Sequence, residues 1–113
     1  MTNPLFDTID VRVDWVMSLE CGEHIPAYAT ESFLNLLDKH NKCGIILSWA
    51  VPGQGGYHHV NEKTNEEITG KIKTMGYVQD DWSLTFQNEA RGQADYLWFS
   101  NTFMVFKRNI SCN

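Results

Sequence analysis

Two carboxylates and an imidazole lie within five positions near the start of this chain. The segment Asp14–His24 (DWVMSLECGEH) begins as an apolar run and ends with Glu20, Glu23 and His24. These residues occupy positions i, i+3 and i+4, so a helical turn here would project all three side chains to one side. Carboxylate and imidazole groups bind divalent cations and transfer protons. This segment is therefore the first candidate for chemistry.

A second polar cluster follows the next apolar run. Residues Gly44–Trp49 (GIILSW) lead into the glycine-rich segment AVPGQGGYHHVN, which carries His58, His59 and Asn61. Either histidine is a candidate general base, because an unperturbed imidazole has a pKa of about 6.5; the alternative is an ordinary surface loop. Ligands of open α/β sheets bind at the carboxyl ends of strands, so the two clusters predict one shared pocket.

Aromatic residues near these clusters allow two interpretations. Trp49 could stack on a bound ring, although a core position is more common for such a residue. Trp98 and Phe99 could line a substrate pocket or pack at an edge of the sheet.

Periodicity predicts the elements that position the first cluster. Val11–Ser18 has the pattern of a strand in a covered sheet, and Gly44 opens a second such strand. Between Pro26 and Asn41 an apolar stripe predicts an amphipathic helix of about three turns. The stripe consists of Phe33, Leu34, Leu36 and Leu37.

The clearest helix signals come after the second cluster. Thr64 and Glu67 form a capping-box pattern, and Gly76 is placed to end the helix. The apolar residues at helical spacing between them are Ile68, Ile72 and Met75.

The remaining residues predict three further elements. We expect a short strand at Tyr77–Gln79, a helix at Ser83–Arg91 with Leu84 and Phe86 directed inward, and a buried strand at Thr102–Lys107 (TFMVFK). The order of strands and helices along the chain favours an α/β fold with a mainly parallel sheet covered by helices.

Composition restricts the classes of protein. With 113 residues, 42% hydrophobic and 20% charged, we expect one globular domain. The net charge of −5 argues against a strong nucleic-acid surface. No apolar run is long enough to span a membrane and the N-terminus lacks a signal-peptide pattern, so we expect a cytoplasmic protein. Three cysteines without CxxC spacing predict free thiols: Cys21, Cys43 and Cys112.

The segments DWVMSLECGEHIP, GIILSWAVPGQGGYHHVN and NTFMVFKR together resemble the C-terminal half of a class I S-adenosylmethionine-dependent methyltransferase. The most specific part is Glu20 with Glu23-His24, which is similar to the E-x-x-E-H motif after the fourth strand of many small-molecule methyltransferases. The resemblance implies part of a Rossmann-like fold, from the fourth strand to an antiparallel C-terminal strand. It implies methyl transfer to an oxygen or nitrogen of a small-molecule acceptor, and it places Leu19 and Glu20 near the cofactor, S-adenosylmethionine.

The same resemblance implies a metal site. A similar motif, joined by a histidine after the fifth strand, binds a divalent metal in plant small-RNA 2′-O-methyltransferases. The ligands here would be Glu20, Glu23, His24 and His59, and these ligand types suit Mg²⁺, Mn²⁺ or Zn²⁺. The alternative is structural: the glutamate caps backbone N–H groups and the histidine supports the loop.

One feature of the family is missing from this sequence. The glycine-rich loop that holds the cofactor is absent, because Pro52–Gly56 does not have G-x-G-x-x-G spacing. We therefore expect residues 1–113 to form a single, incomplete methyltransferase domain that is inactive alone. The alternatives are a non-catalytic interaction module that self-associates through an exposed sheet edge, and a divalent-metal-binding domain.

Overall fold

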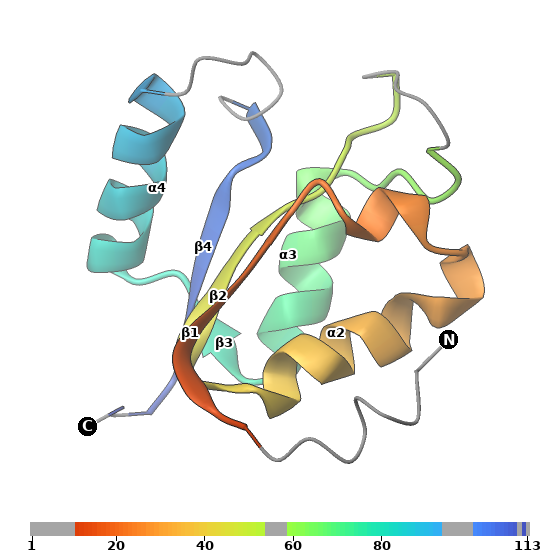
Figure 1. Ribbon diagram of the computed structural model, residues 1–113. Coiled ribbons are helices and arrows are strands. Elements are labelled where there is room, and N and C mark those ends of the chain that lie inside the picture. Colours follow the sequence, from red (N-terminus) through yellow and green to blue (C-terminus); the bar gives the residue numbers. More distant parts are fainter. Residues whose placement is uncertain (1–10, 54–58, 94–100, 111, 113) are drawn as a thin grey trace.

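The computed structural model describes residues 11–53, 59–93, 101–110 and 112 (Figure 1). Four strands and the helices around them make up this part of the chain. In chain order they are β1 (Val13–Leu19), η1 (Gly22–His24), η2 (Ala27–Ala29), α2 (Thr30–Lys39), β2 (Asn41–Ser48), α3 (Asn65–Thr74), β3 (Tyr77–Val78), α4 (Asp81–Gln93) and β4 (Met104–Arg108).

The strands form one mixed sheet in the order β1-β2-β4-β3. β1 and β2 are parallel, and β4 runs antiparallel to both β2 and β3. The predicted α/β class and the antiparallel C-terminal strand are confirmed. The predicted mainly parallel sheet is found only in part. β1, β2 and β3 point in the same direction, but β4 runs the opposite way and lies between β2 and β3. Of the three strand pairings in the sheet, only that of β1 with β2 is therefore parallel.

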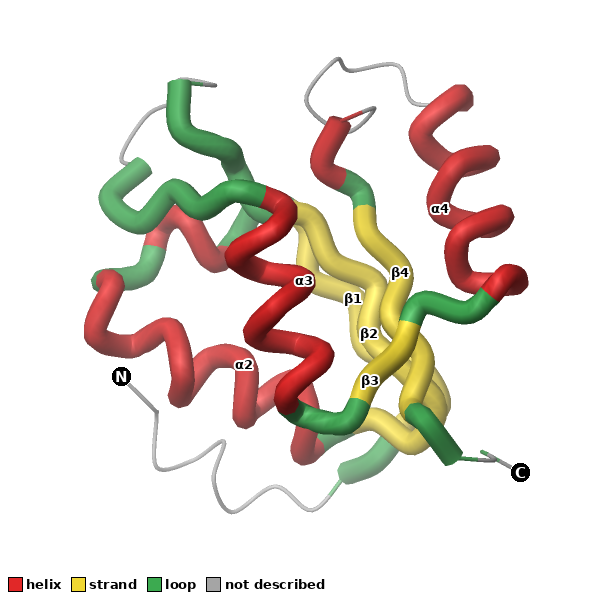
Figure 2. Tube along the Cα trace, turned by 180° about the vertical axis from the view of Figure 1, so that it is seen from behind, coloured by secondary structure: helices red, strands yellow, loops and turns green. Residues whose placement is uncertain are grey.

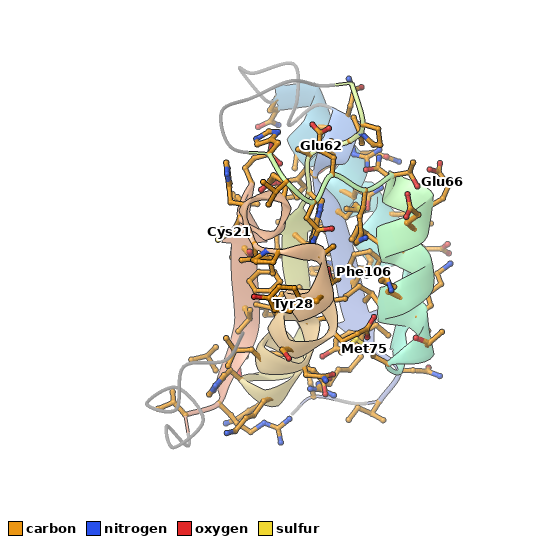
Figure 3. The ribbon with its side chains drawn as sticks, turned by 90° about the vertical axis from the view of Figure 1, so that its right-hand side faces the viewer. Cys21, Tyr28, Glu62, Glu66, Met75 and Phe106 are labelled. Atoms are coloured by element: carbon orange, nitrogen blue, oxygen red, sulfur yellow. A yellow bond between two sulfur atoms is a disulfide. The ribbon has the colours of Figure 1, made fainter. Side chains whose placement is uncertain are left out.

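Helices cover both faces of the sheet. α2 and α3 lie on one face and α4 lies on the other, as Figures 1 and 2 show from opposite sides. The main apolar core lies between the sheet and the α2/α3 layer; in Figure 3, Phe106 of β4 is seen between these two helices. Other buried members of this core are Leu34, Ile45, Leu47, Ile68 and Ile72.

The ends of α3 follow the sequence signals. The Glu67 N–H donates to the Thr64 Oγ1 and the Thr64 N–H donates to Glu67 Oε1, both at 3.1 Å, which completes the predicted capping box. Gly76 has a φ of +99° just beyond the helix, a conformation that glycine adopts without steric cost.

The predicted inward face of α4 is wrong. The helix exists, but Leu84 and Phe86 are 38% and 40% exposed, and its buried side chains are Ser83 and Gln87. The physical reason is a backbone requirement: the Gln87 Oε1 accepts a hydrogen bond from the Val105 N–H of β4 at 3.1 Å. A polar side chain is needed there because β3 is too short to pair with that part of β4.

The prediction of three free cysteines is also wrong. Cys43 and Cys112 form a disulfide across 69 residues, with their Cα atoms 5.1 Å apart, and Cys21 is free and exposed. Spacing along the chain could not indicate this pair, because the contact is made between the sheet and the C-terminal segment. In the described residues, no helix combines the length and apolar character needed to cross a membrane.

Candidate functional site

Glu20 ends β1 with a sharp backbone turn. Its φ is +51°, in the left-handed region that residues other than glycine rarely adopt. The Glu20 N–H donates to Ser48 Oγ at 2.8 Å, and the Ser48 hydroxyl donates to Glu20 Oε2 at 3.1 Å. Ser48 is the buried last residue of β2, so its hydroxyl ties together the carboxyl ends of the two parallel strands.

Glu23 connects the two predicted clusters directly. It lies in η1 and is fully buried. Its Oε1 accepts a hydrogen bond from the Ala50 N–H at 2.8 Å, and its backbone oxygen accepts from the N–H groups of Val60 (2.9 Å) and Asn61 (3.0 Å). One residue of the first loop therefore fixes both ends of the second loop.

The environment of Glu23 favours its protonated form. Desolvation by burial raises the pKa of the carboxyl above its ordinary value of 4.5; the hydrogen bond from Ala50 opposes this, and the negative charge of Glu20 adds to it. Its Oε2 is buried and has no hydrogen-bond partner among the described residues. This carboxyl therefore holds its proton to a higher pH than an exposed glutamate does.

Trp49 and Asn61 anchor the second loop to the core. The Trp49 ring is fully buried and its Nε1 donates to the backbone oxygen of Asn61 at 2.7 Å. The side-chain Nδ2 of Asn61 donates to Thr30 Oγ1 at 2.8 Å. Gly22 lies against the face of the same indole, where a Cβ atom would overlap the ring. Trp49 is thus a core residue, one of the two interpretations that the sequence left open.

The imidazoles of the two loops lie next to each other. The ring centroids of His24 and His59 are 4.8 Å apart at an interplanar angle of 74°. His59 Nδ1 lies 3.2 Å from Glu62 Oε2. When Nδ1 carries the proton it donates to this carboxylate, and Nε2 is then the atom that can accept a proton from another group.

The two predicted clusters therefore meet at one end of the sheet. Cys21 of the first loop and Glu62 of the second both lie in the upper half of the view in Figure 3. Leu19 is the last residue of β1 and is 37% exposed there. His58, Trp98 and Phe99 lie outside the described residues, as do Gln54, Gly55 and Gly56.

The metal site expected at Glu20, Glu23, His24 and His59 stays a prediction. Among the described residues, no group of three or more histidine, cysteine, aspartate or glutamate side chains is arranged to hold a metal ion. One oxygen of Glu23 accepts a hydrogen bond from the Ala50 N–H, and one oxygen of Glu20 accepts a hydrogen bond from the Ser48 hydroxyl. These contacts correspond to the structural alternative, in which glutamate caps backbone N–H groups.

Sequence reasoning did not identify Ser48, Thr30 or Glu62 as parts of this site. Ser48 had a usable signal, because a hydroxyl in the apolar run GIILSW needs a partner once buried. Glu62 follows His59 at i+3, a spacing that permits contact. Thr30 carried no signal, since its partner Asn61 is far away in the sequence.

Comparison of the chain with protein-family models, curated proteins and solved structures finds no match. The geometry of these loops and the sequence motif that they contain are therefore the only indications of function in the described part of the chain.

Proposed function

We propose that this chain forms the acceptor side of a class I S-adenosylmethionine-dependent methyltransferase, which transfers a methyl group to an oxygen or nitrogen of a small molecule. The observation that carries the proposal is the junction made by Glu23. It joins the E-x-x-E-H loop after β1 to the histidine-bearing loop after β2, at the carboxyl ends of two parallel strands, where open α/β sheets bind ligands.

The order of the strands supports the same proposal. By resemblance, β1 and β2 correspond to the fourth and fifth strands of the family, and the C-terminal strand runs antiparallel to them. The sheet has a parallel pair followed by an antiparallel β4 that lies between β2 and β3. Strand order alone does not imply a reaction, so this point concerns the fold only.

His59 is the proposed general base. Glu62 orients its ring through Nδ1, and Nε2 is then available to remove a proton from the acceptor hydroxyl or amine. When bound, the cofactor supplies the methyl group. Leu19 and Glu20 would lie beside it at the end of β1, and the fixed loops would hold the acceptor in line, since positioning supplies much of such a rate enhancement. No step of this proposal is assigned to a metal, whose site at Glu20, Glu23, His24 and His59 stays a prediction.

The cofactor site needs a contribution that these residues do not make. The sequence contains no G-x-G-x-x-G loop, which in Rossmann-like folds lets backbone N–H groups approach the ligand. We therefore propose that another segment or another chain supplies that loop, and that residues 1–113 alone transfer methyl groups poorly or not at all.

Titration calorimetry with S-adenosylhomocysteine, with and without Mg²⁺ or Mn²⁺, tests this proposal. Saturable binding by the folded chain supports a methyltransferase site. Saturation that occurs only with the metal would support Glu20, Glu23, His24 and His59 as its ligands. A folded sample that binds no cofactor under either condition would show that these residues alone make no cofactor site, which is the result expected if another segment or another chain supplies the missing loop.

Substitution of His59 separates binding from chemistry. If cofactor binding is found, His59→Ala should leave it unchanged and abolish transfer to an acceptor. His40→Ala is the matched control, because His40 contacts the Val11 oxygen at the opposite end of the sheet. Equal loss of transfer in both variants would remove His59 from the proposed role.

A second candidate function is a non-catalytic interaction module, and exposed apolar side chains favour it. β1 lies at one edge of the described sheet and exposes Val13 (45%), Met17 (61%) and Leu19 (37%). Trp82 of α4 is 52% exposed and its ring lies 5.5 Å from that of Trp15 on the same face.

Sedimentation analysis tests this second candidate. It should find self-association that Met17→Lys weakens and Lys42→Met does not; a monomer at all concentrations would exclude self-association.

A further inference from the structure

A groove lies between α3 and α4, next to the part of β4 that β3 does not reach. It encloses about 450 Å³. Figure 2 shows the arrangement: α3 and α4 flank β4, and the short strand β3 lies toward one end. None of its described lining residues belongs to the E-x-x-E-H loop or carries His59, so a ligand site here does not rest on the proposed methyl transfer.

The floor of the groove is the edge of β4, where the backbone N–H and oxygen of Val105 are already hydrogen-bonded to glutamine side chains. The Val105 N–H donates to Gln87 Oε1 at 3.1 Å, and Gln79 Nε2 donates to the Val105 oxygen at 3.2 Å and to Gln87 Oε1 at 2.7 Å. Gln87 is only 7% exposed. An added β-strand would have to displace both amides, so this rigid floor favours a small ligand over an extended peptide.

Arg91 contributes a fixed positive charge to the wall. Its Nε donates to the Phe103 oxygen at 2.7 Å, which orients the guanidinium and leaves its two terminal nitrogens for other partners. No carboxylate in the described part of the chain forms an ion pair with it. Desolvation lowers the pKa of Arg91, because part of its charge is removed from water.

The other polar groups of the groove complete a binding surface. Lys73 of α3 adds a second positive charge and forms no ion pair with a described residue, whereas Glu66, at the exposed first turn of α3, is the one carboxylate among the described lining residues. The groove thus offers two cations, in a chain whose net charge is −5.

We propose that the groove between α3 and α4 binds a small molecule through an oxyanion, a carboxylate or a phosphate group, which pairs with Arg91 and Lys73. The planar guanidinium presents two N–H groups to two oxygens of the anion, and the lysine acts as a point charge.

Titration calorimetry at constant ionic strength tests the site with two probes, inorganic phosphate and succinate. We expect saturable binding of at least one, and the stronger of the two identifies which oxyanion the groove prefers. Constant ionic strength matters because non-specific attraction between charges is screened by salt. If neither probe saturates at concentrations up to about 10 mM, ten times a millimolar Kd, the proposal is overturned.

Three variants locate the binding. Arg91→Gln should weaken it about tenfold or more, as loss of about 1.4 kcal/mol implies. Arg12→Gln is the matched control, because Arg12 also donates to a backbone oxygen, that of Asn41, but far from the groove. Lys73→Gln should weaken binding several-fold and, at an exposed position, leaves the fold intact even if Arg91→Gln disturbs it. Unchanged affinity in Lys73→Gln, or equal losses in Arg91→Gln and Arg12→Gln, would contradict the assignment.

Discussion

Glu23 is the residue on which the candidate site depends most. It is the fully buried acidic side chain of η1, and it accepts the Ala50 N–H while its backbone oxygen holds the chain at Val60. An ion in this place is costly, yet its acceptor oxygen is needed because an unpaired buried N–H is costly as well. The burial that accompanies this contact therefore also raises the pKa of the carboxyl.

Glu23→Ala should lower the free energy of unfolding by about 1–3 kcal/mol, since it leaves the Ala50 N–H buried without a partner. Glu23→Gln keeps an oxygen for that N–H and should lose less. Urea denaturation measures both, with Glu89→Gln on the exposed side of α4 as the control. Equal losses for the alanine and glutamine variants would show that the hydrogen bond is not the cause.

The raised pKa of Glu23 also predicts a pH dependence. A raised pKa in the folded state means that the folded chain binds the proton more tightly, so the associated stability is present below the ordinary value of 4.5 and is lost as pH rises through the folded value. The stability of the natural chain relative to Glu23→Gln should therefore fall above about pH 4.5. A difference that stays constant with pH would contradict the shift.

Gly22 is required by close packing at this site. Gly22→Ala would drive a methyl group into the Trp49 ring, and overpacking of this kind costs about 1–3 kcal/mol. Thermal unfolding followed by tryptophan fluorescence should show a lower midpoint. Gly70→Ala is the matched control, because a Cβ there meets nothing within 4 Å and alanine favours the helix. A midpoint for Gly22→Ala as high as that of Gly70→Ala would refute the packing argument.

At the scale of elements, a polar network joins α2 to three strands at the end of the sheet away from the candidate site. Asn41 Nδ2 donates to the Tyr77 Oη at 2.8 Å, and the Tyr77 hydroxyl donates to Asp38 Oδ1 at 2.7 Å. Arg108 forms an ion pair with Asp38 at 3.1 Å and its guanidinium lies 5.0 Å from the centre of the Tyr77 ring. This network connects β2, β3 and β4 where β3 contributes only two residues.

Tyr77 should titrate well above an ordinary tyrosine. Desolvation raises its pKa from 10.0 to about 12; the hydrogen bond from Asn41 opposes the shift and Asp38 adds to it. Because the folded state holds the proton more tightly, stability should be unaffected below about pH 10 and fall as the pH rises toward 12. Absorbance titration of phenolate formation measures this. Tyr77→Phe should remove the part of the absorbance change that occurs at the highest pH. A titration curve that Tyr77→Phe leaves unchanged above pH 11 would contradict the assignment.

At the scale of the whole molecule, the Cys43–Cys112 disulfide closes most of the chain into one loop. Thiol counting on denatured, unreduced protein should find one free thiol, that of Cys21. Reduction should lower stability by about 2–4 kcal/mol, because the bond limits the freedom of the unfolded chain. Cys21→Ser, as the control, should lose the free thiol and keep its stability; three free thiols in protein purified under oxidising conditions would disprove the bond.

Local sequence patterns were sufficient for most elements of the fold. The capping box of α3 and Gly76 act within a few residues of each other, so their effect can be recognised without the rest of the chain. The apolar strand Thr102–Lys107 was recognised for the same reason, although the observed strand is Met104–Arg108. The proximity of the two polar clusters also followed from sequence, because carboxyl ends of adjacent parallel strands share one edge.

Only the tertiary structure decided which polar atoms meet. Gln87 faces inward because the Val105 N–H of β4 has no partner in the sheet. Cys43 forms a disulfide with Cys112, 69 residues further along the chain, and Glu23 Oε1 accepts a hydrogen bond from the Ala50 N–H. Each contact joins residues far apart in sequence and satisfies a group that is exposed in the unfolded chain and buried only after folding. Periodicity indicates which side of an element is apolar, but it does not indicate which distant polar groups will need a hydrogen-bond partner once the chain is folded.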